Sequence, residues 1–497
     1  MNDGLTLDSG EDESWGEGHT PRDGDAETER REYLMNDGWN DKESDAPRGV
    51  SESPRLTSSP SRFTKHVAST FAVRLLMTGN SVLAGIIVAR WLGAEGLGQL
   101  AVINVAVGTL VQIASLGLPS ANTYFLSQDD RQLRAAAMNS LVFALLLGVL
   151  LALGLVGIAR WRPEWLGFIP PKLIAIAALS LPFQLLTLIG LNIFLALGRI
   201  AHFNLMDLAG QTFVLINALL ALIVMRGGLW MLVSLNTVSS VLLGVAMIVL
   251  IGLHAVRLKQ AAPWRLDFSL LRRMLSYGLK FHISILAGAL IFRADLLVVN
   301  HFRGPGEAGV YSVASQVALM LMLLPGVIAT LLFPRVTGEQ DLTGETTCLV
   351  SRHTAVLLLF CCIAAIPFSY LLPLLYGEAF ADVTTQLLIL LPGVYLIGVE
   401  SVLVQHLNSI GLPRTIPLSW IATLIVNIVL VFIFVPRFGA RGAAVASTLS
   451  YALIFALIAY YFASTTGKPI SDALILRGHE LRGLLRLGRF RSLRGAP

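Results

Sequence analysis

The stretch AAAMNSLVFALLLGVLLALGLVGI, residues 135–158, contains 24 residues and no charged side chain. An α-helix rises about 1.5 Å per residue, so about 20 apolar residues cross the roughly 30 Å hydrocarbon core of a bilayer. Backbone polar groups find no water inside that core, and a helix satisfies them within one segment. Residues 135–158 therefore predict a transmembrane helix.

Apolar runs of this kind occur twelve times along the 497 residues. They lie near 66–90, 98–118, 135–158, 172–196, 206–225, 229–253, 281–301, 309–334, 353–376, 383–408, 415–435 and 441–464. Each one is long enough to span a bilayer as a helix. The sequence thus predicts an all-α integral membrane protein with about 12 transmembrane helices.

The composition excludes an ordinary soluble protein, because only 14% of the residues are charged whereas a soluble domain carries about 25%. The basic residues stand between and after the apolar runs, where lipid headgroups are the expected neighbours. We therefore expect no nucleic-acid partner, in spite of the net charge of +5. Cys348, Cys361 and Cys362 form neither a disulfide framework nor a metal-ligand spacing.

The two ends of the chain differ from the apolar middle. Residues 1–65 hold 16 acidic and 8 basic residues, and we expect a disordered acidic segment. Its tetrapeptide MNDG recurs at 35–38, which makes Met35 an alternative start. Residues 465–497 carry Arg482, Arg486 and Arg489 on one helical face, which predicts a basic amphipathic helix that binds anionic lipids. The alternative is a frayed, solvated tail.

The lysine and arginine distribution predicts the orientation. If the N-terminus is cytoplasmic, the inner loops carry 12 basic residues and the outer loops 8. Basic loops favour the cytoplasmic side, so we expect both termini there, with the chain in a bacterial cytoplasmic (inner) membrane. The longest inner segment, 254–280, holds six basic residues and is interpreted as a cytoplasmic linker.

An internal repeat divides the spans into two sets of six. LGAEGLGQLAV (92–102) is similar to RGPGEAGVYSV (303–313), LALGR (195–199) to NSIGLPR (408–414), and RGGLWMLVS (226–234) to RGAAVASTL (441–449). Their glycines align, Gly93 with Gly304, Gly198 with Gly411 and Gly228 with Gly442, at offsets of 211, 213 and 214 residues. An even number of spans per repeat makes the repeat parallel. We expect two six-helix bundles, residues 66–253 and 281–464, around a central cavity that opens alternately to either side.

Charges inside the spans mark candidate sites, because each costs about 2.5–3.5 kcal/mol at the membrane centre. Arg74, Thr78 and Ser81 form a polar stripe on the first span. The stripe predicts a substrate-binding cavity wall, although Arg74 could instead extend to the inner headgroups.

The seventh and tenth spans add four more candidates. Arg293 and His282 are eleven residues apart and share a helical face, so both are assigned to the cavity. Asp295 and Glu400 are candidates for cation coupling or for an ion pair. The alternative for both carboxyl groups is a purely structural role.

Several segments resemble the signatures of Wzx-type polysaccharide flippases, which belong to the multidrug/oligosaccharidyl-lipid/polysaccharide exporter superfamily. These segments are ARWLGAEGLGQLAVINV (89–105), RADLLVVNHFRGPGEAGVYSVASQV (293–317), LLFPRVTGE (331–339), LLYGEAFADVTTQLLIL (374–390) and FGARGAAVASTLSY (438–451). Asp295 matches an acidic position of the seventh-helix signature. The resemblance covers roughly residues 62–465 and leaves both end segments unexplained.

The resemblance implies flipping of a polyprenyl-pyrophosphate-linked oligosaccharide for exopolysaccharide, capsule or O-antigen synthesis. It implies polysaccharide polymerase and glycosyltransferases as partners, and no cofactor beyond a coupling Na⁺ or H⁺.

Other functions remain open at this stage. The first is a Na⁺- or H⁺-coupled small-molecule exporter of the same superfamily, and the second is a lipid II flippase, whose relatives carry two further helices. A membrane glycosyltransferase or polymerase is disfavoured by the short outer loops and by the lack of a nucleotide-binding, zinc or nucleophile motif in a fitting context. We therefore expect no enzymatic activity and no catalytic residues. A purely structural membrane protein is disfavoured by the duplication around intramembrane charges.

Overall fold

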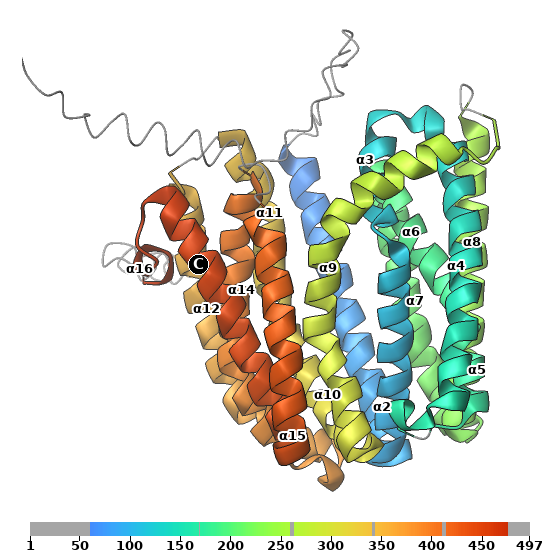
Figure 1. Ribbon diagram of the computed structural model, residues 1–497, viewed down its shortest axis with the longest axis vertical. Helices are drawn as coiled ribbons and strands as arrows, with labels where there is room; N and C mark the ends of the chain where they lie inside the picture. The colour runs from blue at the N-terminus through green and yellow to red at the C-terminus, as the bar shows by residue number, and fades with distance from the viewer. Residues whose placement is uncertain (1–59, 168, 259–262, 340–342, 410–413, 476–497) are drawn as a thin grey trace, which may run out of the picture. The chain divides into compact units, whose positions relative to one another are not determined.

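The computed structural model describes residues 60–475, apart from 168, 259–262, 340–342 and 410–413. Every regular element in this described part is a helix, as Figure 1 shows. The predicted all-α fold is confirmed.

The helices of the first half are α2 (Pro60–Ser115), α3 (Leu118–Gln128), η1 (Asp130–Gln132), α4 (Leu133–Trp161), η2 (Pro163–Leu166), α5 (Pro171–Ala178), α6 (Leu181–Ala196), α7 (Ile200–Ala218), η3 (Leu219–Val224) and α8 (Gly228–Arg257). The helices of the second half are α9 (Phe268–Arg303), α10 (Pro305–Met320), α11 (Leu323–Glu339), α12 (Glu345–Ser369), α13 (Leu372–Tyr376), η4 (Glu378–Phe380), α14 (Val383–Ser409), α15 (Thr415–Thr466) and α16 (Ser471–Leu474).

Ten helical segments of the described chain are long and apolar enough to cross a membrane. Two of them, Ala72–Ser115 and Thr415–Thr466, are each interrupted by one glycine with non-helical backbone angles, Gly93 and Gly439. The chain reverses direction at both glycines, so each segment provides two crossings. The predicted number of about twelve spans is thereby confirmed.

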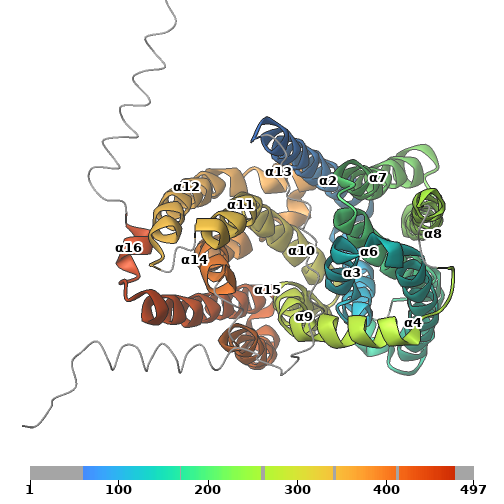
Figure 2. The same cartoon turned by 90° about the horizontal axis from the view of Figure 1, so that it is seen from above.

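The spans form two bundles, seen side by side from above in Figure 2. In the first bundle α6 packs on α4 and α8, and α7 packs on α2 and α8. In the second bundle α14 packs on α11, α12 and α15, and α15 also packs on α9. The bundles meet where α2 packs against α9 and α10.

Glycine conformations identify the repeat. Gly93 (φ 69°, ψ −173°) and Gly304 (φ 84°, ψ 173°) share a backbone conformation that L side chains rarely adopt, and they are 211 residues apart. Gly228 has φ 66° and Gly439 has φ 60° at the same offset. The parallel pseudo-repeat is confirmed, with one correction to the third pair: Gly228 corresponds in conformation to Gly439, which lies at the helix reversal, and not to Gly442.

The repeat also forms the seam between the bundles. A Cβ atom added to Gly98 of α2 would collide with the carbonyl oxygen of Pro305 on α10. A Cβ added to Gly309 of α10 would collide with the carbonyl oxygen of Ala94 on α2. Ala94 and Pro305 are again 211 residues apart, so the two contacts are equivalent by the repeat. The two helices approach this closely only because both positions lack a side chain.

We call the end of the bundles that carries Gly93, Gly304 and Gly439 the glycine end (Figure 1). We call the opposite end, where α2 starts and α15 finishes, the termini end. At the glycine end the bundles are joined by Arg90 of α2. Its guanidinium donates hydrogen bonds to the carbonyl oxygens of Leu374 and Leu375 at α13.

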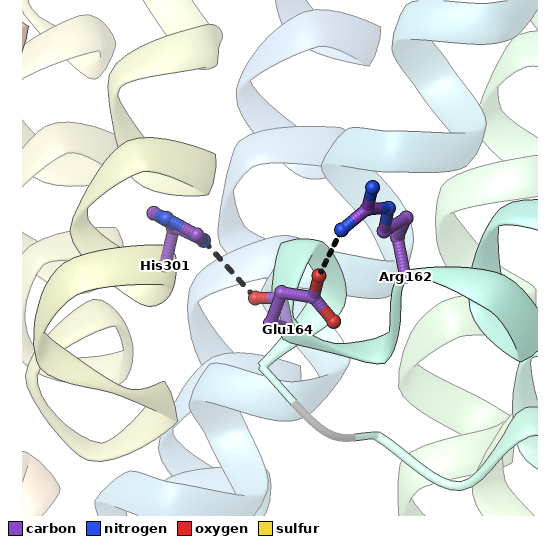
Figure 3. A network of polar contacts seen from close by, with 3 residues as sticks. All are labelled: Arg162, Glu164 and His301. Atoms are coloured by element: carbon purple, nitrogen blue, oxygen red, sulfur yellow. Dashed lines mark hydrogen bonds and ion pairs between the residues drawn. The ribbon is translucent and has the colours of Figure 1, made fainter.

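The element η2 forms a second bridge at the glycine end. Nδ1 of His301 on α9 lies 3.1 Å from the carbonyl oxygen of Glu164, and Arg162 pairs with the Glu164 carboxylate at 3.5 Å (Figure 3). At the termini end the first half of α9 packs on α3, and the rings of Tyr277 and Tyr124 stack with centroids 4.3 Å apart.

Some sequence predictions fall on or near the edges of the described residues. The acidic extension up to residue 59, with Met35, and the tail from residue 476 onward, which holds the expected amphipathic helix, lie outside them. α2 already starts at Pro60, inside the segment expected to be disordered. α8 ends at Arg257 and α9 starts at Phe268, so the expected linker 254–280 is helical at both of its ends. The proposed domain boundaries remain predictions.

Candidate functional site

A cavity of about 1030 Å³ lies between the two bundles. Its wall is formed by α2, α6, α7 and α8 from the first bundle and by α9 and α10 from the second. Sites for drug-sized ligands have volumes of about 300–1,000 Å³, so this cavity accommodates a cargo at least as large as a typical drug.

The polar stripe predicted on the first span borders this cavity. Arg74, Thr78 and Ser81 all contribute to the wall, and the Arg74 side chain is exposed. The Thr78 hydroxyl donates to the carbonyl oxygen of Arg74 at 2.9 Å, within the same helix. Gln316 of α10 donates from Nε2 to the Ser81 hydroxyl at 2.7 Å. The stripe therefore faces both the cavity and the opposite bundle.

Arg293 of α9 borders the cavity from the other bundle. One of its guanidinium nitrogens lies 3.8 Å from the position that a Cβ of Gly108 on α2 would take. Its side chain makes neither a hydrogen bond nor an ion pair with any residue in the described part of the chain. The guanidinium is thus free to bind an anion in the cavity.

Asp295 also contributes to the wall, but it is only 3% exposed. Oδ2 accepts hydrogen bonds from the Tyr311 hydroxyl of α10 and, at 2.8 Å, from the Ser447 hydroxyl of α15. Oδ1 accepts from the backbone N–H of Leu296 at 2.8 Å. The carboxyl group therefore connects three helices of the second bundle through neutral donors, and it forms no ion pair with an arginine in the described part of the chain.

His282 does not border the cavity; it is 4% exposed and hydrogen-bonds to the backbone of Ile113. The reason lies one turn earlier on α9. Gly278 and Gly117 bring their backbones into contact, with no room for a Cβ on either. This close approach buries the helical turn of α9 that carries His282 against the end of α2.

Glu400 also lies away from the cavity. It is 2% exposed on α14, and its Oε1 has no hydrogen-bond partner among the described residues. α14 packs against α10, α11, α12 and α15 inside the second bundle. The helix carrying Glu400 is therefore surrounded by protein.

The sequence did not identify most of the polar wall. Asp207 borders the cavity and lies close enough to Arg74 for their charges to attract. Asp207 and Gln211 are four residues apart and so share one face of α7, and this spacing could have identified them. On α8 the partners of Asn217 are Asn236 and Ser239, each at 2.9 Å.

The charged residues that border the cavity are two arginines and two aspartates: Arg74, Arg293, Asp207 and Asp295. The cavity wall is therefore of mixed charge. Asp207 faces Arg74, and the Asp295 carboxyl group is occupied by its own donors. The Arg293 side chain has no hydrogen-bond or ion-pair partner among the described residues.

Two bundles related by a parallel repeat, with a cavity between them that carries four charged side chains on its wall, are an architecture of membrane transporters. Residues 63–338, more than half of the chain, match the family model described as polysaccharide biosynthesis protein. The chain belongs to this family. The resemblance to Wzx-type flippases of the multidrug/oligosaccharidyl-lipid/polysaccharide exporter superfamily is confirmed.

The chain is similar to three curated proteins in particular. It is 24% identical over 249 residues to the probable low-salt glycan biosynthesis flippase Agl15 of Haloferax volcanii, covering 48% of this chain and 52% of that protein. It is 25% identical over 244 residues to the probable flippase AglR of the same organism, covering 47% and 49%. A candidate O-antigen transporter of Shigella flexneri is 21% identical over 196 residues, covering 38% and 47%. The matches thus span about half the length of these relatives.

Two solved structures share the fold. The lipid II flippase MurJ in an inward closed conformation superposes with a TM-score of 0.68 at 15% identity, over 82% of this chain and 89% of MurJ. An inward-facing multidrug transporter of the MATE family superposes with a TM-score of 0.64 at 16% identity, over 80% of this chain and 99% of the transporter.

Proposed function

We propose that this protein flips a polyprenyl-pyrophosphate-linked oligosaccharide across the cytoplasmic membrane for polysaccharide synthesis. The observation that carries the proposal is the cavity of about 1030 Å³ between the bundles, with Arg293 on its wall and no partner for the Arg293 side chain among the described residues. The family match and the named activities of the relatives support the same function.

The physical task is to move a pyrophosphate and its sugars past hydrocarbon. Burying an ionised group without compensation is prohibitively expensive, and every sugar hydroxyl adds to that barrier. A polar cavity replaces the lost water. In this proposal Arg293 and Arg74 bind the pyrophosphate, and side chains such as Gln211 and Asn236 bind sugar hydroxyls. The polyprenyl tail stays in the lipid.

The direction of transport follows from the two ends. The bundles are joined at the glycine end through Arg90 and η2. We place the termini end, with both chain termini, on the cytoplasmic side because its loops carry more lysine and arginine. Flipping then requires the glycine-end contacts to break while the termini end closes.

Coupling to Na⁺ or H⁺ is part of the proposal. Asp295 is the better candidate because its carboxyl group lies at the cavity wall between α9, α10 and α15. Binding or release of Na⁺ or H⁺ at this carboxyl group would alter contacts among all three helices. Glu400 is a second candidate because a buried carboxyl oxygen without a partner can hold a proton. Polysaccharide polymerase and glycosyltransferases are the expected protein partners.

The test is a flipping assay with the purified full-length chain in liposomes that contain a fluorescent polyprenyl-pyrophosphate oligosaccharide. Accessibility of the glycan to a membrane-impermeant enzyme is measured with and without an ion gradient. We expect protein-dependent exposure, at least about tenfold slower in Arg293→Ala. Arg160→Ala, which removes an exposed arginine at the end of α4, is the matched control and should flip as the wild type does. Equal rates for the two variants would remove Arg293 from the mechanism.

Asp207 favours one alternative, a Na⁺- or H⁺-coupled exporter of small molecules. A carboxylate at the cavity wall, beside Arg74, suits a cationic cargo. In that case the liposomes would show no glycan exposure, but would show gradient-dependent movement of a cationic dye that is lost in Asp207→Asn.

A further inference from the structure

A second cavity, of about 600 Å³, lies at the glycine end of the second bundle. It is separate from the central cavity, with which it shares no wall residue. Three arginines border it from three helix ends: Arg303 at the end of α9, and Arg437 and Arg441 on either side of the reversal in α15. Neither the proposed flipping pathway nor the coupling candidates use this cavity.

Its carboxylates are already engaged. Asp382 accepts a hydrogen bond from Arg441 at 2.8 Å. Glu307 accepts from the backbone N–H of Ala440 at 2.6 Å and so occupies the start of the second half of α15. One arginine and both carboxylates are thereby accounted for within the protein.

Arg303 and Arg437 have no such partner. Neither side chain forms a hydrogen bond or an ion pair with another residue in the described ranges. Two guanidinium groups at one cavity, with the nearby carboxylates engaged elsewhere, produce a local excess of positive charge. Guanidinium groups of this kind recognise phosphate oxygens through paired, charge-assisted hydrogen bonds.

The remaining walls indicate the kind of phosphate. Phe434 and Phe438 lie on one side with ring centroids 6.3 Å apart, and Phe438 is 62% exposed on the apolar surface of the span. Gln386 also borders the cavity; it is 1% exposed and its Oε1 lacks a hydrogen-bond donor among the described residues. A ligand with a phosphate, a neighbouring hydroxyl and an acyl or prenyl chain matches all three features.

The repeat provides an internal comparison. At the offset of 211 residues, Arg303 corresponds to Leu92, Arg437 to Arg226 and Arg441 to Trp230. Only one of the three arginines is present in the first bundle. The arginine cluster is therefore a feature of the second bundle and is not required by the shared fold.

We propose that this cavity binds the phosphate of a lipid headgroup through Arg303 and Arg437, with the lipid chain along Phe438. Two lipids share this chemistry: an anionic phospholipid of the membrane and the polyprenyl pyrophosphate carrier. Binding here does not depend on the flipping proposal, because the site is outside the central cavity.

The experiment measures lipid binding to the purified full-length protein in detergent by native mass spectrometry. The probes are phosphatidylglycerol, phosphatidylcholine and undecaprenyl pyrophosphate without a glycan. We expect the wild type to retain phosphatidylglycerol in preference to phosphatidylcholine. In the double variant Arg303→Gln/Arg437→Gln, the apparent affinity for phosphatidylglycerol should fall roughly tenfold. Arg226→Gln removes the equivalent arginine of the first bundle and should bind like the wild type.

Competition between the probes identifies the source of the phosphate. If undecaprenyl pyrophosphate displaces phosphatidylglycerol at a lower concentration in the wild type but not in the double variant, the site holds the carrier lipid. If phosphatidylglycerol is retained, the site holds a membrane phospholipid. Either result supports a phosphate site. A double variant that melts at the wild-type temperature and binds phosphatidylglycerol with unchanged affinity would overturn the proposal, whatever the flipping assay shows.

Discussion

The carboxyl group of Asp295 is bound on both oxygens inside a membrane bundle, by Tyr311, Ser447 and a backbone N–H. The Tyr311 and Ser447 donors come from α10 and α15 and are lost when these helices separate from α9, so Oδ2 keeps its donors only while the three helices are assembled. A buried acceptor that loses its donor costs about 1–3 kcal/mol. The same residue that is a candidate for coupling thus also stabilises the bundle.

The first prediction separates these two roles. Tyr311→Phe removes one donor to Oδ2 and keeps the ring, so the free energy of unfolding should fall by about 1–3 kcal/mol. Thermal melting of the detergent-solubilised protein measures the change. Tyr370→Phe, at a position 63% exposed, is the matched control and should melt as the wild type does. An unchanged melting temperature in Tyr311→Phe would show that the hydrogen bond contributes nothing to stability.

A complementary variant tests coupling at the same residue. Asp295→Asn keeps the size of the side chain and one acceptor oxygen, but it can neither release a proton nor provide a negative charge to a cation. Flipping in liposomes should become independent of the ion gradient, while the protein remains folded. A variant that flips with the wild-type gradient dependence would assign Asp295 to structure alone.

At the scale of the element, α9 is fixed at its start by Asp267. Its carboxylate accepts from the backbone N–H of Leu270 at 2.9 Å and from the Ser269 hydroxyl at 2.7 Å. The hydrogen bond from Leu270, followed by that from Ser269, lowers the pKa of Asp267 below its ordinary value of 3.8. The backbone of Asp267 also exchanges two hydrogen bonds with the Asn139 side chain of α4, at 2.8 and 3.0 Å.

The lowered pKa determines the sign of a pH effect. A carboxyl group with a depressed folded pKa stabilises the fold above its unfolded value, and this contribution is lost as the pH falls through the folded pKa. At pH 7 the wild type should therefore have a higher melting temperature than Asp267→Ala. The difference between the two melting temperatures should shrink below about pH 3.8. Melting curves of both proteins from pH 7 to pH 3 measure it. Asp130→Ala, outside α9, is the control, and a gap that widened on acidification would contradict the assignment.

The crossing of α2 and α10 depends on two glycines. Gly309→Ala places a methyl group against the carbonyl oxygen of Ala94, and overpacking of this kind costs about 1–3 kcal/mol. Gly306→Ala on the same helix is the matched control, because a Cβ there meets no atom within 4 Å. We expect a lower melting temperature for Gly309→Ala and no loss for Gly306→Ala. Equal melting temperatures for the two variants would show that α2 and α10 accommodate the added methyl group without a loss of stability.

At the scale of the whole molecule, the glycine end holds contacts between the two bundles that the proposed flipping cycle would have to break. η2 reaches from the first bundle to α9 of the second, and the residues drawn in Figure 3 show the bridge: the backbone oxygen of Glu164 faces His301, and the Glu164 side chain pairs with Arg162. An alternating-access mechanism requires this bridge and the Arg90 contacts to break in each cycle. Contacts that break repeatedly must be weak individually, and a single hydrogen bond such as that between His301 and the Glu164 carbonyl oxygen contributes only about 0.5–1.5 kcal/mol.

Locking this end gives the prediction for the whole molecule. Glu164→Cys and His301→Cys, combined in a chain whose three native cysteines are replaced, should be joined by a short thiol cross-linker. The joined protein should lose flipping in liposomes and regain it when a cleavable linker is cut. Each single cysteine variant treated with the same reagent is the control. Full activity of the joined protein would mean that the glycine end does not open during transport.

The sequence alone determined the membrane class, the number of spans and the repeat. These properties depend on the local sequence alone. A span needs about 20 apolar residues whatever surrounds it, and a helix reversal at Gly93 or Gly304 needs a glycine because of its own backbone angles. The sequence also singled out Arg74 and Arg293 as cavity candidates, and both border the central cavity, since an intramembrane charge is expensive unless it faces a polar space.

Only the tertiary structure decided which polar faces meet. The sequence could not distinguish the cavity residue Asp295 from the enclosed Glu400, because both are single carboxylates in apolar helices. The close approach of Gly117 and Gly278 removes His282 from the cavity, and the packing of α7 on α8 brings Asp207 and Asn217 to it. The direction that a helix face points is set by contacts between residues far apart in the chain, and no periodicity within one span contains that information.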